Sequence, residues 1–239
     1  MMNQAIADEL SSYATSDKIP DYMRFFKTGK GEYAEGDKFL GIKVPDTRKV
    51  VKKYFKTMSF DEIKAFLYSP YHEHRLFALL VLVAQYQSKD FEDKKAICGF
   101  YIKHIDQINN WDLVDVTAPH ILGDYLLKDR EHIHLLYSFS HSSKLWRRRI
   151  AIISSFAFIK VNNIKLTLEL VDYRLIDEEK HDLMHKAMGW AIRKVGDKDL
   201  QAMLDYLKPR YKKMPRTMLR YAIEKLDEPL RQAYLKGER

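Results

Sequence analysis

The 239-residue sequence has few of the residues that build disulfide-stabilised or β-rich domains. Its single cysteine, Cys98, excludes an internal disulfide and any cluster of cysteine zinc ligands. Nine glycines and seven prolines are about half of average usage, too few for a chain that turns every ten residues or so. No apolar run approaches the roughly 18 residues of a membrane span. Because residues 1–18 also lack a signal-peptide pattern, we expect a soluble protein of the cytoplasm.

Positive charge is concentrated in the last two-fifths of the sequence. Residues 1–140 carry 19 lysines and arginines against 20 aspartates and glutamates, whereas residues 141–239 carry 22 against 13. The asymmetry is typical of a protein with a polyanionic partner, either nucleic acid or a membrane surface. A basic face that only keeps the protein soluble is the alternative, and charge alone leaves both open.

Apolar residues recur at helical spacing along almost the whole chain. One such stripe consists of Leu76, Leu79, Leu80 and Val83. No segment alternates like a strand, so the sequence predicts an all-α protein with residues 1–239 as a single domain. The longest predicted helices are 72–87, 90–105, 110–127, 143–160, 177–196 and 215–235. Ser59 with Glu62 and Asp197 are predicted caps, and the glycine-rich segment Thr28–Lys38 is predicted to be a loop.

Five of the predicted helices contain related segments. These are HRLFALLVL (74–82), WDLVDVTAP (111–119), RRRIAIISS (147–155), HKAMGWAIR (185–193) and LRYAIEKL (219–226). Alignment on a small central residue brings Ala78, Ala151, Gly189 and Ala222 into register, at a period in the high thirties. This period is typical of HEAT-like arrays, in which stacked helix pairs curve into a superhelix. We therefore predict HEAT-like repeats with a basic concave groove; a helical bundle with chance similarity is the alternative.

Asp115 stands where the repeat places a small side chain. The midpoint between Ala78 and Ala151 falls on this carboxylate, which is the strongest local departure from the pattern. Trp111 precedes it by four residues, so the two side chains share one face of a helix. Pro119 has no N–H to bond to the carbonyl of Asp115, so the helix should bend or break there.

Equivalent helices of stacked repeats line one face, which leads us to expect Arg149 and Trp190 beside Asp115. The predicted cluster is one carboxylate, two indoles and an arginine on a basic surface. The plain alternatives are that Trp111 and Trp190 are core residues and that Asp115 forms a buried ion pair with Arg149.

Four motifs resemble those of the AlkD-type DNA alkylation repair glycosylases. They are FLGIKVPDTRKV (39–50), WDLVD (111–115), LWRRRIAI (145–152) and KAMGW (186–190), and the resemblance covers nearly the whole chain. It implies a HEAT-like superhelix that excises N3- and N7-alkylated purines from duplex DNA. It also implies that Asp115 is the catalytic aspartate, that Trp111 and Trp190 flank the lesion, and that Arg149 lies in the same pocket.

The chemistry that this resemblance implies needs few groups. A purine alkylated at N3 or N7 is already cationic and leaves without a general acid, so we expect no cofactor and no metal. Asp115 would stabilise the oxocarbenium-like sugar that water attacks. Trp111 and Trp190 would contact the cationic nucleoside, at about 0.5–2 kcal/mol for a cation–π contact, and Arg149 would hold a phosphate. Members of the family are understood to act without flipping the base, which a groove without a deep pocket fits.

The expected partner is double-stranded DNA containing alkylated purines, bound by a monomer without any membrane contact. Basic side chains in the last two-fifths of the chain are candidate phosphate contacts. Those that we predict to contact DNA are Arg148, Lys186, Arg193 and Arg220. A non-catalytic DNA-binding repeat protein and a protein-interaction scaffold are the alternative functions.

Metal hydrolysis is a weaker alternative. His181 and His185 are four residues apart, as in HExxH, but Asp182 replaces the glutamate and no third ligand is evident. His72 and His74 are two residues apart and diverge on a helix. These patterns indicate no metal site.

Overall fold

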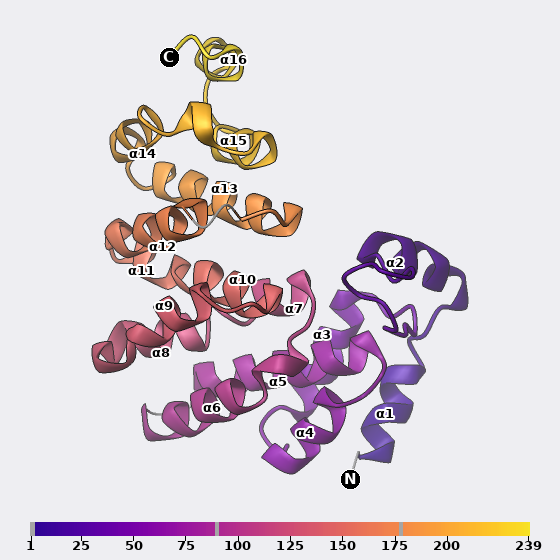
Figure 1. The fold of residues 1–239 in the computed structure, drawn as a ribbon. Helices are drawn as coiled ribbons and strands as arrows, with labels where there is room; N and C mark the ends of the chain where they lie inside the picture. Colours follow the sequence, from indigo (N-terminus) through magenta and orange to yellow (C-terminus); the bar gives the residue numbers. More distant parts are fainter. Residues whose placement is uncertain (1–2, 89–90, 177–178) are drawn as a thin grey trace. The chain divides into compact units, whose positions relative to one another are not determined.

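The computed structural model describes residues 3–88, 91–176 and 179–239, and its regular elements are helices (Figure 1). These ranges contain no β-strand, only an isolated bridge between Lys38 and Tyr71. The predicted all-α class is therefore confirmed. None of the described helices is long and apolar enough to cross a membrane. The chain divides into two compact units, Met1–Ile121 and Leu122–Arg239, so the single domain stays a prediction.

The first unit is organised around α5 (His72–Ser88). The other helices are α1 (Gln4–Ser11), α2 (Ile19–Phe26), α3 (Val44–Tyr54), α4 (Phe60–Leu67), α6 (Phe91–Lys103) and α7 (Trp111–Asp115). Helices α3, α4, α6 and α7 all contact α5. Almost every side chain of α5 is buried, on all sides of the helix. Residues 76–83 of α5 are apolar on all sides, and such a segment is stable only inside a core, so α5 forms the centre of this unit.

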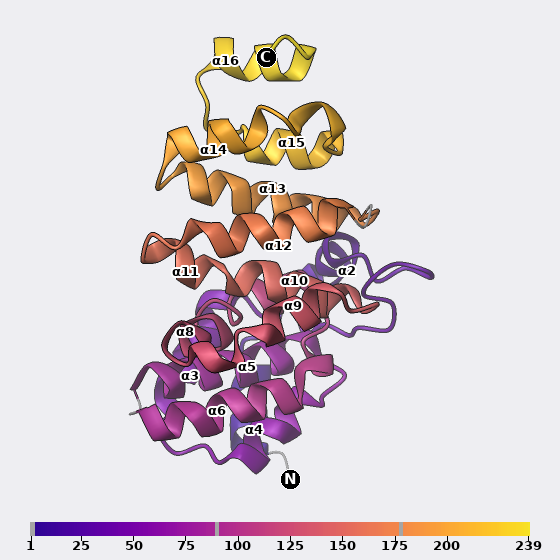
Figure 2. The same cartoon turned by 60° about the vertical axis from the view of Figure 1, so that its left-hand side comes forward.

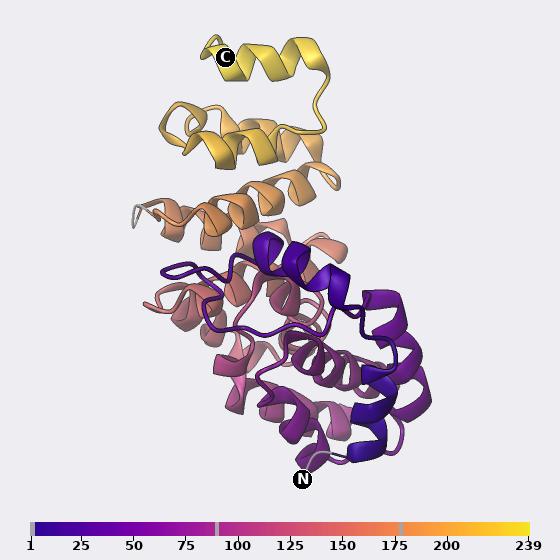
Figure 3. The same ribbon diagram turned by 90° about the vertical axis from the view of Figure 1, so that its right-hand side faces the viewer.

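The segment between α2 and α3 is tied to the start of α5 (Figure 3). Thr28–Lys38 contains turns and no helix, which confirms the predicted loop. Beyond it, the buried carboxylate of Glu73 accepts hydrogen bonds of 2.8 to 3.2 Å from the backbone N–H groups of residues 40–42. Gly41 has a φ of 78°, and a Cβ there would lie 2.1 Å from the carbonyl oxygen of Thr15. Only glycine fits this position.

The second unit is a stack of short helices (Figure 2). They are α8 (Leu122–Lys128), α9 (His134–Ser140), α10 (Leu145–Ser154), α11 (Phe156–Lys160), α12 (Ile164–Ile176), α13 (Asp182–Gly196), α14 (Leu200–Leu207), α15 (Arg216–Ala222) and α16 (Glu228–Lys236). Helix α10 packs on α13 and α13 packs on α15, which makes one row, while α9 packs on α12 in a second row. Two such rows are what stacked helix pairs produce. The basic concave groove stays a prediction.

The small residues aligned in the sequence are all buried inside helices. Ala78, Ala151 and Ala222 are at most 1% exposed, and Gly189 is buried as well. A Cβ on Gly189 would lie 2.4 Å from the carbonyl oxygen of Met218, so α13 approaches the backbone of α15 directly. The alignment therefore identified buried helix positions, one of which, Gly189, lies at a close helix contact.

Three predicted helices are interrupted. Residues 110–127 form α7 and α8, with the break at Pro119 that the sequence predicts. Residues 143–160 divide at Ser155, whose hydroxyl donates to the carbonyl of Ile152 at 2.6 Å. Residues 215–235 divide into α15 and α16, because Asp227 caps α16 through the N–H of Leu230 at 3.0 Å.

Two other boundaries differ from expectation. The N-cap of α14 is Asp199, which accepts from the N–H of Ala202 at 2.9 Å, and not Asp197, which bonds Lys225. Ser59 and Glu62 form the predicted capping box. The predicted starts at residues 90 and 177 lie outside the described residues. Residues 179–181, predicted to be helical, are not, and α13 begins at Asp182 after its N-cap His181.

Gly189→Ala should destabilise the protein, because the added methyl group forces α13 away from α15. We expect a loss of about 1–3 kcal/mol, the usual cost of overpacking, measured by urea unfolding. Gly99→Ala in α6 is the matched control, since a Cβ there meets no atom within 4 Å. It should leave stability unchanged or raise it by up to ~1 kcal/mol. Equal effects of the two substitutions would contradict the close helix contact.

Candidate functional site

Helix α7 positions two of the predicted site residues, Trp111 and Asp115, as its first and last residues. A helix of five residues is unstable alone, so its ends must be fixed by other groups. At the start, Asn110 accepts from the N–H of Trp111 at 2.8 Å. At the end, the buried hydroxyl of Thr117 donates to the carbonyl of Leu113 at 2.6 Å. Both site residues are half-buried and lie one turn apart.

Trp111 is held by aromatic residues of α2. Its ring stacks on Phe26 at 5.6 Å between centroids, and Phe25 meets it edge-on at the same distance. Phe26 stacks in turn on Phe39, at 5.1 Å. Phe25 is 62% exposed, although most large apolar residues of the unit are buried. These phenylalanines were not predicted as site residues. The sequence feature that could have indicated them is an adjacent aromatic pair on a short amphipathic helix.

Trp111 also lines a pocket of about 840 Å³ within the first unit. Its wall is largely aromatic and aliphatic, from Tyr22, Phe25, Phe26, Phe39, Ile42, Val44, Leu76 and Trp111. Its charged residues are Asp21, Arg24, Lys27, His72, Glu73 and Asp112. This pocket was not predicted from the sequence, and it leaves the predicted groove untested.

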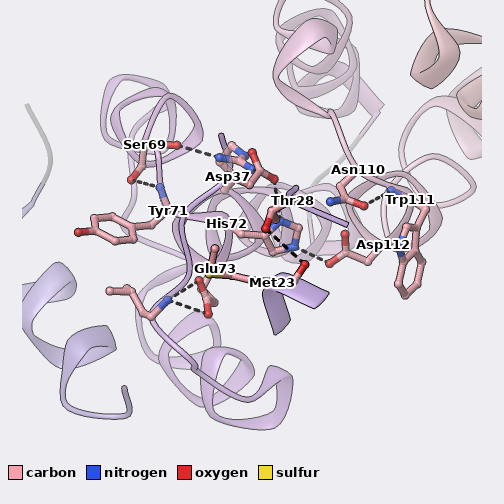
Figure 4. Close-up of polar contacts among 12 residues, drawn as sticks. Met23, Thr28, Asp37, Ser69, Tyr71, His72, Glu73, Asn110, Trp111 and Asp112 are labelled. Carbon is pink, nitrogen blue, oxygen red and sulfur yellow. Dashed lines mark hydrogen bonds and ion pairs between the residues drawn. The ribbon is translucent and has the colours of Figure 1, made fainter. Parts of the chain in front are cut away.

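A cluster of charged side chains forms part of this wall (Figure 4). The Nε2 atom of His72 is 2.7 Å from a carboxylate oxygen of Asp112, and Nδ1 is 3.5 Å from Asp37. Asp37 also accepts from Arg75 at 2.6 Å. Burial opposes the imidazolium, but the charge and hydrogen bond of Asp112, aided by Asp37, raise the pKa of His72 to about 9. His72 is therefore a cation at neutral pH.

His74 lies on another face of α5, and its pKa is shifted in the opposite direction. Its Nδ1 shares a hydrogen bond of 2.9 Å with the hydroxyl of Ser69, and burial lowers its pKa to about 4. The two histidines point away from each other, as the sequence predicts, and among the described residues their hydrogen-bond partners are different.

The carboxylate of Asp115 influences the buried phenol of Tyr101. Burial is the main reason why the pKa of Tyr101 is raised, and the negative charge of Asp115 adds to the effect. The hydroxyl of Tyr101 bonds Thr117 at 3.0 Å, the residue that terminates α7. Asp115 is itself half-buried, and partial exclusion of water strengthens the electrostatic effect of a charge.

Arg149 and Trp190 belong to the second unit. Arg149, on α10, is buried, and its Nη1 donates to the carbonyl of Leu183 on α13 at 2.5 Å. Trp190, on α13, is half-buried and meets Phe156 edge-on at 4.8 Å. The structure thus places both residues on neighbouring helices of one row. Their meeting with Trp111 and Asp115 stays a prediction.

Arg148 has a structural role in the second unit. It makes two hydrogen bonds to the carboxylate of Glu179, at 2.7 and 3.1 Å, and others to the carbonyls of Ser142 and Ser143. Burial opposes ionisation of Glu179, but the bonds from Arg148 and from the N–H of His181 keep its pKa lowered. The DNA contact predicted for Arg148 stays a prediction.

The other predicted DNA contacts differ in their surroundings. Lys186 forms a surface pair with Asp182 at 2.8 Å, and Arg193 pairs with Glu224. Arg220 is exposed on α15. Surface pairs contribute little to stability and can be exchanged for a phosphate at small cost. These three contacts also stay predictions.

The HDLMH segment is part of a helix start. His181 is the N-cap of α13, and its Nδ1 accepts from the N–H of Leu183 at 3.2 Å. The Nε2 of His185 bonds the carbonyl of Glu179 at 2.5 Å. Because these ring nitrogens are used in capping, the described contacts give no support to a zinc pair.

The chain is similar to known DNA alkylation repair proteins in sequence and in fold. The sequence profile of a family described as "DNA alkylation repair enzyme" matches residues 6–226. A solved structure, a predicted DNA alkylation repair enzyme from Enterococcus faecalis, has a similar fold with a TM-score of 0.71 and 17% identity. The similarity covers 90% of this chain and 97% of that one. A search of curated proteins found no match.

A helical fold that extends over nearly the whole chain and a profile match of the same extent agree with each other. The chain belongs to the DNA alkylation repair enzyme family. Membership supports a role in DNA repair, with DNA as the substrate, and confirms the family resemblance of the four sequence motifs.

Arg148→Met should destabilise the second unit, because Glu179 is 4% exposed and would keep only its longer ion pair with Arg174, at 3.2 Å. We expect a loss of about 1–3 kcal/mol in the free energy of unfolding, below the full cost of leaving a buried charge unpaired. Lys165→Met, whose surface pair with Glu169 spans 3.7 Å, is the control and should cost less than about 0.5 kcal/mol. Denaturant unfolding of both variants checks this, and a neutral Arg148 variant would contradict the structural role.

Proposed function

We propose that this protein is a DNA glycosylase that removes positively charged N3- or N7-alkylated purines from duplex DNA by hydrolysis of the N-glycosidic bond. The observation that carries the proposal is helix α7, which presents an indole and a carboxylate one turn apart in a chain of this repair family. Action as a monomer on DNA in the cytoplasm is part of the same proposal.

The proposed reaction needs no acid at the leaving group. An alkylated purine carries a formal positive charge, so the base leaves as a neutral molecule and takes the electron pair of the bond to C1′. The remaining sugar develops oxocarbenium character, and a water molecule attacks C1′ and loses a proton. This is glycoside hydrolysis with one carboxylate instead of two.

Asp115 supplies the negative charge in this scheme. Its half-buried position at the end of α7 supports the role, because charge stabilisation is strongest where water is excluded. The same carboxylate orients the attacking water and accepts its proton.

Trp111 supplies an aromatic face for the cationic base. The stack on Phe26 and the edge contact of Phe25 support this role, since they hold the indole in one orientation before DNA arrives. A cation–π contact of about 0.5–2 kcal/mol then favours the charged nucleoside over an unmodified one. Trp190 is proposed as the second such face, and Arg149 as a phosphate contact.

Asp115→Asn should abolish base release while duplex binding is kept. We expect release of 7-methylguanine from a defined duplex to fall by about 10²–10³-fold, the scale for losing a preorganised electrostatic group. Asp61→Asn, at an exposed position on α4 of the same unit, is the control and should act like wild type. Single-turnover release of the free base is the measurement.

The outcomes of this experiment separate the candidate functions. Normal release by Asp115→Asn would remove the carboxylate from the mechanism. Tight, salt-sensitive duplex binding without release by the wild type would indicate a non-catalytic DNA-binding protein. Absence of duplex binding would favour a protein-interaction scaffold.

Arg220→Gln should weaken duplex binding about equally for all sequences. Loss of one phosphate contact should reduce the slope of log K against log salt by about 1. Lys165→Gln is the control, because this side chain is exposed on α12, in the other row of helices. Fluorescence anisotropy over a salt series measures both slopes, and equal slopes would argue against α15 as a DNA-contacting helix.

A further inference from the structure

His72 links the core of the first unit to the helix that carries Trp111 and Asp115. It is the first residue of α5 and is 2% exposed. Its Nε2 donates to Asp112, the residue that follows Trp111 on α7. This bond joins two segments that are 40 residues apart in sequence.

A second path from His72 to Trp111 runs through aromatic rings. One neighbour of the imidazole is Phe26, at 4.7 Å between centroids, and another is Phe39, stacked at 5.0 Å. Phe26 stacks on Trp111. His72 therefore supports the indole twice, by holding α7 through Asp112 and by backing the ring on which the indole rests.

We propose that His72, as an imidazolium, is a positioning residue that fixes the orientation of Trp111 and of helix α7, and that the site loosens when this cation is lost. The part of this inference that concerns base release depends on the function proposed above. His72 itself takes no part in the chemistry, because the proposed reacting groups are at Trp111 and Asp115.

The charges around His72 explain why the cation matters. Two carboxylates face it, Asp112 from α7 and Asp37 from the loop after α2, and Arg75 on α5 is the second cation of the set. The charges of the two carboxylates are neutralised by those of the His72 imidazolium and the Arg75 guanidinium, away from bulk water. Loss of the proton from His72 leaves two carboxylates with one cation, which is unfavourable away from water.

The other titratable groups nearby do not take over this role. Glu73 is the next residue on α5, but its carboxylate is bonded to the backbone of residues 40–42. Tyr22 of α2 packs edge-on against Phe39, and burial raises its pKa, so it stays neutral in the range of interest. Asp21, Arg24 and Lys27 also line the pocket, but they are exposed to solvent, and Arg24 pairs with Asp21 at 2.9 Å. We therefore assign the alkaline transition of the buried cluster to His72.

The direction of the pH effect follows from the raised pKa. With a pKa of about 9 in the folded protein and of 6.5 for a free imidazole, the folded state binds the proton more tightly. The stabilisation is fully present below about pH 6.5 and is lost as the pH rises through about 9. The orientation of Trp111 should be lost over the upper part of this range, with a midpoint near pH 9.

The test is fluorine NMR of protein labelled with 5-fluorotryptophan. The chain has 3 tryptophans, and Trp111→Phe assigns the resonance of Trp111. In the wild type we expect this resonance to shift between about pH 7 and pH 10, with a midpoint near 9. In His72→Gln it should already have the alkaline position at pH 7 and should not titrate.

His74→Gln is the matched control. This buried histidine is on the same helix but contacts Ser69, and its low pKa keeps it neutral over the whole range. The resonance of Trp111 should titrate in this variant as in the wild type. A wild-type resonance that stays constant from pH 7 to about pH 10, or one that titrates unchanged in His72→Gln, would overturn the proposal.

The effect of His72 on the proposed reaction is measured as base release at about pH 7.5. His72→Gln should release 7-methylguanine about 10–100-fold more slowly than wild type at saturating enzyme, since misplacement by about 1 Å has this scale of effect. Duplex affinity should change little. If the wild type releases no base, the proposed function fails, whereas the NMR titration still decides whether His72 positions Trp111.

Discussion

The first unit depends on four successive polar side chains that are buried at the start of α5. His72 holds α7, Glu73 binds the backbone of residues 40–42, His74 bonds Ser69, and Arg75 holds Asp37. Each is at most 6% exposed, and buried groups of this kind are stable only when they are hydrogen-bonded or paired. One helical turn therefore fixes the loop after α2, the segment before α3 and the helix that bears the candidate catalytic carboxylate. The next eight residues of α5, 76–83, are apolar and supply the core that these contacts require.

This arrangement suits the proposed reaction, in which the substrate brings its own positive charge. The protein then needs to supply a few groups in fixed positions, and it does not need to supply an acid. A short helix is a poor support by itself, and α7 is stable because Asn110, Thr117 and His72 constrain it from three directions. The stack of Phe26 on Trp111 adds a fourth constraint. The free-energy cost of orienting these groups is then met during folding, and the groups need no further reorganisation during the proposed reaction.

The sequence was sufficient for the fold class and for much of the pattern of close contacts. The buried small residues Ala78, Ala151, Gly189 and Ala222 were identified by repeat alignment, because small side chains are needed wherever helix backbones approach. Helix ends were less predictable, since Ser155 ends a helix by a bond to its own backbone that spacing does not reveal. The signal for α16, Asp227 followed by Pro229, was present but overlooked. The support behind Trp111 was not predictable: His72 and Asp112 are 40 residues apart, and polar residues in sequence gave no sign of being buried.

The rows of the second unit have a consequence for the length of the stack. Helix α13 touches α10 on one side and α15 on the other, so each helix in the row depends mainly on its immediate neighbours. A helix pair gained or lost at the end of the stack leaves the remaining contacts as they were. The number of helix pairs in the stack is therefore independent of the contacts that hold α7 in the first unit.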